Sequence, residues 1–128
     1  ALSLSILLCY SCSSFKSPNT TSQMGDIRSE VRPVATLIIA VRQNDVNLFK
    51  SVYSSRMKSV LEKTGWKIGL GKYRKTFSEE FGEYQLDDFT LSYSGDGNAG
   101  LVYITFKNKQ MGELRVIRED SVWKLNEK

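Results

Sequence analysis

The spacing of apolar residues changes once along this chain of 128 residues, close to Gly82, and the change limits the folds available to it. Before Gly82 the apolar residues recur every three or four positions, as they do on one face of an α-helix. After it they recur every second position, as they do along a half-buried β-strand. Helices followed by antiparallel strands predict an α+β fold, in which the helices pack on a single sheet.

Two helices are expected between Pro33 and Gly65. Pro33 is acceptable in the first turn of a helix, and one apolar stripe runs from there to Val41. Asn44 interrupts the stripe. Asp45 is a good N-cap for a second helix, which repeats the apolar spacing until Gly65 ends it.

A loop is expected after Gly65, because Trp66 is soon followed by Gly69 and Gly71. A third, shorter helix then carries aromatic residues at intervals of four, and Gly82 ends it. These aromatic residues are Tyr73, Phe77 and Phe81.

Four strands are expected in the last third of the chain, over residues 89–93, 101–106, 111–118 and 122–125. Gly, Asn and Asp residues are concentrated between them, and the connections are short. Strands joined in this way form an antiparallel meander, so the sheet is expected to follow the order of the sequence.

The first twelve residues form an uncharged, mostly apolar run that ends at Cys12, with the small residue Ser11 before it. This order resembles the end of a bacterial lipoprotein signal peptide, in which the cysteine after the cleavage site is lipidated. We therefore expect residues 1–12 to be a partial signal peptide, residues 13–32 a flexible Ser/Thr-rich tether, and residues 33–128 the folded domain. The resemblance implies a lipid-anchored protein of the bacterial cell envelope, on its periplasmic or extracytoplasmic side.

Two other interpretations of this segment remain open. A plain secretion signal has the same general composition, and Cys9 and Cys12 have the C-x-x-C spacing of redox proteins. The redox motif acts at the start of a helix in a βαβ unit, whereas here an apolar leader precedes it and a polar segment follows. A membrane-spanning helix is excluded because it needs about twenty apolar residues.

The chain contains no histidine, and this absence excludes several kinds of chemistry. Ser-His-Asp and Cys-His nucleophile systems, imidazole acid–base catalysis and zinc sites built on histidine all require one. The formal net charge of +4 is mild, so we expect no nucleic-acid partner. We also expect no metal and no cofactor.

Two segments resemble the nuclear transport factor 2-like superfamily. In residues 40–49 a polar pair ends one helix, Asp45 caps the next, and Leu48 and Phe49 point inward. Residues 112–125 form a charged strand that turns and finishes on Trp-Lys-Leu, which is similar to the terminal hairpin of the superfamily's small envelope lipoproteins. The resemblance covers residues 33 onward and implies three N-terminal helices on a curved four-stranded sheet, with a conical pocket between them.

The resemblance also implies an enzymatic alternative. Enzymes of the superfamily work inside the conical pocket, some of them with an Asp as general base and a Tyr that stabilises the oxyanion. A small isomerase- or dehydratase-like enzyme would use such a pair here. The candidate carboxylates are Glu83, Asp87 and Asp88, and the candidate phenols are Tyr53, Tyr73, Tyr93 and Tyr103.

The function we expect is non-catalytic: a lipid-anchored envelope module that binds a small apolar ligand or a protein partner. Binding would use the conical pocket or the sheet face, and the sheet face would also serve a homodimer. The expected ligand-binding residues are Tyr53, Trp66, Tyr73, Phe77, Tyr93 and Tyr103, with Cys12 as the lipidation site. A weaker alternative is contact with an anionic polymer or lipid through Lys67, Lys72, Arg74 and Lys75.

Overall fold

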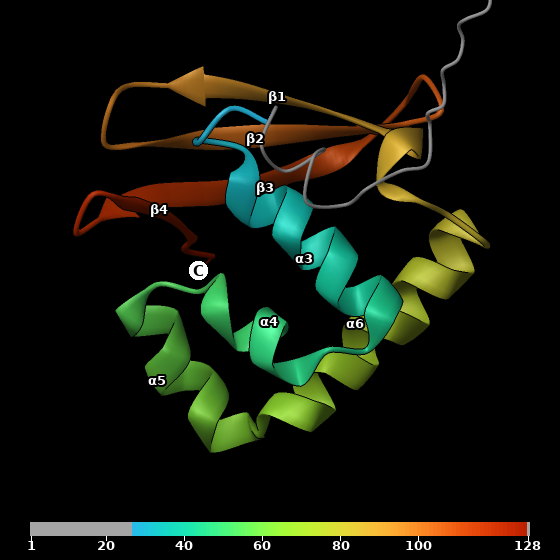
Figure 1. Cartoon of the computed structure of the whole chain (residues 1–128), viewed down its shortest axis with the longest axis horizontal. Helices are drawn as coiled ribbons and strands as arrows, with labels where there is room; N and C mark the ends of the chain where they lie inside the picture. Colours follow the sequence, from blue (N-terminus) through green and yellow to red (C-terminus); the bar gives the residue numbers. More distant parts are fainter. Residues whose placement is uncertain (1–26, 128) are drawn as a thin grey trace, which may run out of the picture.

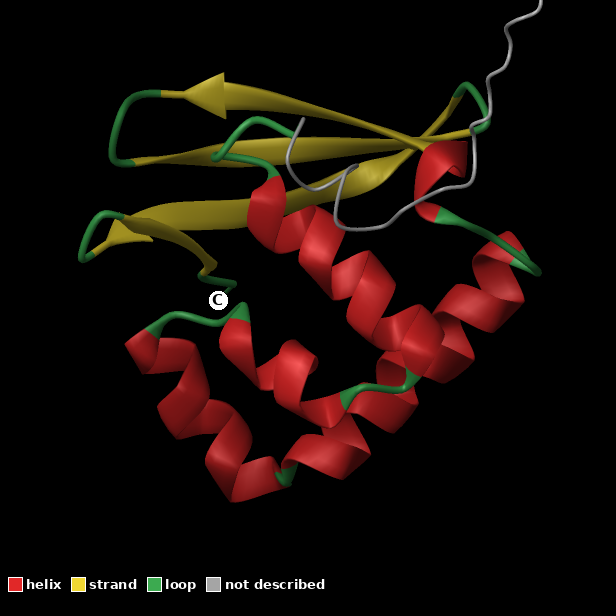
Figure 2. Cartoon of the chain, in the orientation of Figure 1, coloured by secondary structure: helices red, strands yellow, loops and turns green. Residues whose placement is uncertain are grey.

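The fold is α+β, as the sequence predicts. A computed structural model describes residues 27–127, and its helices lie on one side of the sheet (Figures 1 and 2). The helices are α3 (Arg32–Gln43), α4 (Val46–Ser51), α5 (Ser55–Thr64) and α6 (Trp66–Phe81). A 3-10 turn, η1 (Leu86–Asp88), leads into the strands β1 (Phe89–Gly95), β2 (Ala99–Phe106), β3 (Lys109–Glu119) and β4 (Val122–Leu125).

Helix α3 lies at the centre of the molecule. The predicted apolar stripe is buried, and so are Ala35, Ile39 and Ala40 on the other sides of the helix. A helix that is apolar on most sides is stable only when other elements surround it. Helices α4 and α6 and strand β4 pack against α3, so it forms the middle of the core.

The junction between α3 and α4 confirms the predicted cap. Asn44 ends α3 in the left-handed conformation, with φ of 57°, which asparagine tolerates better than most residues. Asp45 then caps α4, because its carboxylate accepts a hydrogen bond of 3.0 Å from the main-chain N–H of Leu48.

The prediction of one helix from Asp45 to Gly65 is wrong, because the chain divides into α4 and α5. At the break, Val52 O accepts a hydrogen bond of 2.7 Å from Leu125 N, and Ser54 N donates one of 2.9 Å to Leu125 O. Ser54 then caps α5 by accepting from Met57 N. The apolar spacing continues across the break and does not reveal it. The division coincides with two features, the pairing with Leu125 and the Ser54 cap.

The prediction of a loop between Gly65 and Tyr73 is also wrong. Helix α6 begins at Trp66 and includes Gly69 and Gly71, so the described chain has four α-helices where three were expected. A glycine inside a helix costs about 1 kcal/mol relative to alanine. Burial of Leu70, which is 2 % exposed, offsets that cost.

The sheet is the predicted meander, with its antiparallel strands in the order β1-β2-β3-β4. Pairing places Tyr93 opposite Val102, and Val116 opposite Leu125. Val102, Val116 and Leu125 are buried members of the core, so their face of the sheet is the one that the helices cover. The other face carries exposed residues, among them Thr90, Ser92, Glu113 and Arg115.

Packing begins before Pro33. Val31 is 6 % exposed, and Ile27 packs against the core. The guanidinium of Arg32 donates a hydrogen bond of 3.1 Å to Ile27 O. The rest of the segment expected to be a tether, residues 13–26, lies outside the described residues, as does the expected signal peptide.

Replacing either of two glycines by alanine is expected to change the stability of the protein, in opposite directions at the two positions. The Gly71 position has no heavy atom within 4 Å of an added Cβ, whereas at Gly100 an added Cβ would lie 2.5 Å from Ser94 O and 2.6 Å from the Tyr93 ring. We predict that Gly71→Ala raises the free energy of unfolding by about 1 kcal/mol. Gly100→Ala is expected to lower it by about 1–3 kcal/mol.

Urea denaturation of the two variants and the wild type measures both effects. A Gly100→Ala protein as stable as the wild type would contradict the packing of the Tyr93 ring over this hairpin.

Candidate functional site

An apolar pocket of about 160 Å³ lies between α3, α6 and the covered face of the sheet. Helix α3 contributes three aliphatic side chains to its wall, α6 contributes three aromatic ones, and strands β1 to β3 close the remaining side. The principal lining residues are Val34, Leu37, Ile38, Tyr73, Phe77, Phe81, Phe89, Ile104 and Leu114.

The aromatic wall follows from the spacing of α6. Tyr73, Phe77 and Phe81 occur at intervals of four, so they lie one above another on one face of the helix. Successive rings meet edge to face, with centroids 5.9 Å and 5.2 Å apart. Such contacts stabilise aromatic pairs beyond their buried area, and they give the pocket a firm wall.

The same aromatic series continues into the sheet. Phe81 contacts Phe89 on β1 and Phe106 on β2, with ring centroids 5.0 Å and 4.7 Å apart. Tyr84, in the connection after α6, packs against both Phe77 and Phe81. These rings close the end of the pocket near the connection between α6 and β1.

The residues that line this pocket include two carboxylates, Glu80 of α6 and Glu113 of β3, and both are exposed. Strand alternation directs the Glu113 side chain to the uncovered face of the sheet, away from the pocket. A carboxylate that is exposed to water is poorly placed to act as a base on a buried substrate. The interior can therefore exclude water and hold apolar groups, and its lining residues supply no buried acid.

Tyr53 is a core residue outside the lining of the pocket, and its hydroxyl group has no hydrogen-bond partner in the described part of the chain. The side chain is 1 % exposed, and its Oη has no hydrogen bond within residues 27–127. Burial raises the pKa of Tyr53 far above its ordinary value, and the neighbouring Tyr73 raises it further. Burial also raises the pKa of Tyr73, so both phenols stay protonated at neutral pH.

The expected ligand-binding residues are only partly brought together. Tyr73 and Phe77 line the pocket. Tyr53 and Trp66 instead pack around the buried ring of Phe49, 5.2 Å and 6.0 Å from it between centroids. The Trp66 indole also donates a hydrogen bond of 2.8 Å to Glu62.

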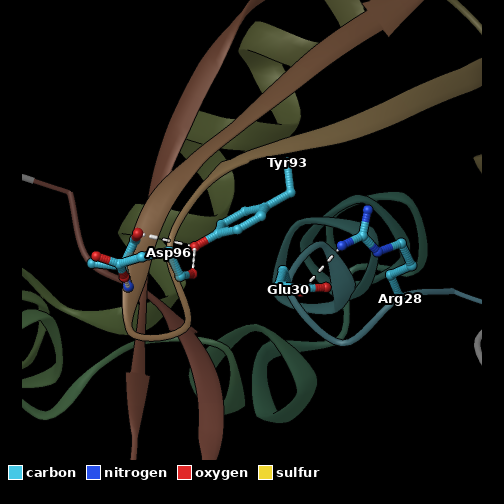
Figure 3. A network of polar contacts seen from close by, with 5 residues as sticks. Arg28, Glu30, Tyr93 and Asp96 are labelled. Carbon is cyan, nitrogen blue, oxygen red and sulfur yellow. Dashed lines mark hydrogen bonds and ion pairs between the residues drawn. The ribbon is translucent and has the colours of Figure 1, made fainter.

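Tyr93 closes the hairpin between β1 and β2 (Figure 3). Its hydroxyl lies close to Asp96 O and 2.9 Å from Ala99 O, and it donates to these two main-chain oxygens. Its ring packs on Trp123 of β4, with centroids 5.4 Å apart. Tyr103 follows the buried Val102 along β2, so strand alternation places it on the uncovered face of the sheet.

The candidate carboxylates lie in the connection between α6 and β1, away from the apolar pocket. Asp87 and Asp88 belong to η1, and Asp88 accepts a hydrogen bond of 2.9 Å from Gln85 N. Glu83 and Asp88 instead line a second, polar groove of about 630 Å³ at the other side of α6.

This groove contains a pair of arginines that the sequence analysis did not connect. Arg42 lies at the end of α3 and Arg74 on α6, and both line the groove together with Tyr84. The sequence pattern places Arg74 in a basic run and indicates no binding role for Arg42. Local spacing carries no signal for their meeting, because it depends on how α3 packs against α6.

No family model matches this chain. No curated protein and no solved structure matches it either. The resemblance to the nuclear transport factor 2-like superfamily therefore stays a prediction. Within residues 27–127, no three metal-ligating side chains gather as a metal site requires. No helix in that part of the chain is long and apolar enough to cross a membrane.

Tyr53 and Tyr93 differ in whether the hydroxyl group is hydrogen-bonded, and replacing each by phenylalanine tests what that hydroxyl contributes to stability. We predict that Tyr53→Phe raises the free energy of unfolding by about 1 kcal/mol, because it removes a buried hydroxyl that lacks a partner. Tyr93→Phe is expected to lower it by about 1 kcal/mol, because it removes a hydroxyl bonded to the hairpin. Urea denaturation at pH 7 compares them, and a strongly destabilised Tyr53→Phe protein would show that this hydroxyl has a partner.

Proposed function

We propose that this protein is a non-catalytic binding module that takes a small apolar molecule into the pocket between α3, α6 and the sheet. One observation carries the proposal: the pocket is lined mainly by aliphatic and aromatic side chains, and the two carboxylates among its lining residues are exposed. Binding pockets of this kind gain affinity from apolar area removed from water.

The size of the pocket selects the ligand. An empty apolar cavity of about 150 Å³ accommodates a benzene molecule, and this pocket has a volume of about 160 Å³. Burying six carbon atoms contributes about 5 kcal/mol at about 0.8 kcal/mol per carbon. That free energy corresponds to a dissociation constant near 1 mM or somewhat below it. The ligand would be a single ring, a short alkyl chain or the apolar end of a larger molecule.

We further infer that the domain is a nuclear transport factor 2-like cone. The inference is supported by helices gathered on one face of a four-stranded antiparallel meander, with a pocket between the two layers. The superfamily's enzymes combine a buried acid with a tyrosine in that place. Tyr73 lines the pocket here, but Glu83, Asp87 and Asp88 do not, so the binding role has more support than the isomerase- or dehydratase-like one.

Titration with benzene tests the pocket. We predict saturable changes in the amide NMR signals of residues on α3, α6 and β2, and no such changes with pyrene, which is too large to enter. Ile104→Trp places a larger side chain in the pocket and is expected to abolish benzene binding. Leu101→Trp, on the uncovered face of the same strand, serves as the control and is expected to bind benzene as the wild type does.

Overpacking in Ile104→Trp costs about 1–3 kcal/mol, so circular dichroism must first show that the variant is folded. If Ile104→Trp does not fold, the comparison of benzene with pyrene in the wild type still tests whether the pocket binds a small apolar molecule. Equal responses to both probes, or none to benzene, would contradict the pocket proposal.

We also propose that the module is attached to the membrane through a lipid on Cys12. The support is the sequence alone, because this residue lies outside the described part of the chain. Metabolic labelling with a radioactive fatty acid in a bacterial host should label the wild type and leave Cys12→Ser unlabelled. Cys9→Ser is the matched control and should remain labelled. Equal labelling of wild type and Cys12→Ser would remove the anchor from the proposal.

A further inference from the structure

The polar groove on the other side of α6 brings two guanidinium groups together from distant parts of the chain. Arg42 comes from the last turn of α3, and Arg74 comes from the middle of α6. Both residues are exposed and line the same groove of about 630 Å³. This volume falls within the range of about 300–1,000 Å³ that is usual for small-molecule sites.

Hydrogen bonds to the main chain hold both arginines in place. Arg42 Nε donates a hydrogen bond of 2.7 Å to Tyr84 O, and Arg74 Nη1 donates one of 2.7 Å to Val41 O. Each guanidinium has five N–H donors, so several remain available to a ligand. Because the main-chain bonds already restrict these side chains, a ligand would lose less side-chain entropy on binding them.

Neither Arg42 nor Arg74 forms an ion pair within residues 27–127. The ion pair in this part of the chain joins Arg28 to Glu30, which do not line the groove. Glu83 and Asp88 line the groove but lie beyond ion-pair distance of both arginines, and Asp88 is engaged by the main chain of η1. Each guanidinium is a planar fork of N–H donors that fits an oxyanion, and the two line the same groove.

A third donor lies near the two charges. The hydroxyl of Tyr84 is close enough to Arg74 and Arg42 that their positive charges oppose the effect of burial, which raises the pKa of this phenol. The phenol therefore remains protonated at neutral pH and can donate a hydrogen bond to an anion.

We propose that this groove binds a small anion carrying a carboxylate or phosphate group, with Arg42 and Arg74 as its charged contacts. The site is separate from the apolar pocket, because Phe77, Phe81 and Tyr84 pack together between them. The same oxyanion chemistry is offered by a free metabolite and by the headgroup of an acidic lipid, and the experiment separates these sources.

The test is NMR titration of the full chain with inorganic phosphate and with citrate at constant ionic strength, with chloride as the reference anion. Saturable shifts are expected at the Nε–H signals of Arg42 and Arg74. The double variant Arg42→Lys, Arg74→Lys keeps the charge but loses the fork, and its affinity for both anions should fall about tenfold. Lys75→Gln, next to Arg74 but outside the groove, is the control for general surface charge and should retain wild-type affinity.

Glu83→Gln gives a test in the opposite direction. This exposed side chain makes no described hydrogen bond, so its loss should leave folding intact while removing a negative charge from the groove. Affinity for phosphate and citrate should rise. Weaker binding in Glu83→Gln, unchanged binding in the double lysine variant, or an equal loss in Lys75→Gln would each overturn the proposal.

Vesicles distinguish the two sources of the oxyanion. Sedimentation with vesicles of phosphatidylcholine that contain phosphatidic acid, lost in the double lysine variant, would identify a lipid headgroup as the ligand. Binding of the free anions without sedimentation would identify a soluble ligand. Failure to bind phosphate, citrate and the vesicles would overturn the anion site and leave the apolar pocket untouched, because benzene binding measures that pocket independently.

Discussion

Two main-chain hydrogen bonds connect the helical layer to the end of the sheet, and much of the structure depends on them. They join Leu125 to the residues on either side of Tyr53, as in a single parallel bridge. The bridge ends α4, turns the chain and directs the Tyr53 side chain into the core. It also brings the first turn of α5 to the residues after β4, where Arg56 Nε donates a hydrogen bond of 3.2 Å to Asn126 Oδ1.

Side chains around this bridge reinforce it. Ser54 donates a hydrogen bond of 2.7 Å to Asn126, and Glu119 accepts hydrogen bonds from the main chain and hydroxyl of Ser55 at the start of α5. Ser54 and Asn126 are 72 residues apart in the sequence. Bringing them together therefore costs the entropy of closing a long loop, whereas forming a helix from neighbouring residues has no such cost. We expect these contacts to form late in folding, after α3 and the hairpins have begun to pack.

The sequence predicted the features that depend on neighbouring residues. Asp45 as a helix cap, the change of element type near Gly82 and the four-stranded meander all follow from local spacing and turn chemistry. The apolar spacing did not reveal the break between α4 and α5, because it continues across it. The Ser54 cap is a local signal there, whereas the pairing with Leu125 is a long-range contact that no local pattern indicates. The start of α6 was missed for a related reason: Gly69 and Gly71 favour a loop locally, and only the burial of Leu70 shows why a helix is preferred there.

The candidate sites also divide into features set by neighbouring residues, which the sequence indicates, and features set by long-range packing, which it does not. Tyr73 and Phe77 were expected together because one helix face carries both. Tyr93 and Tyr103 have the same chemistry, but an interval of ten residues that includes a hairpin places them on opposite faces of the sheet. The pairing of Arg42 with Arg74 depends on the approach of α3 to α6, for which neither segment carries a sequence signal.

Helix α6 forms a wall of both cavities. Tyr73 belongs to the apolar pocket and the next residue, Arg74, to the polar groove, since successive residues of a helix point about 100° apart. The two cavities therefore share α6 as a wall, and each is lined by a different face of this one helix.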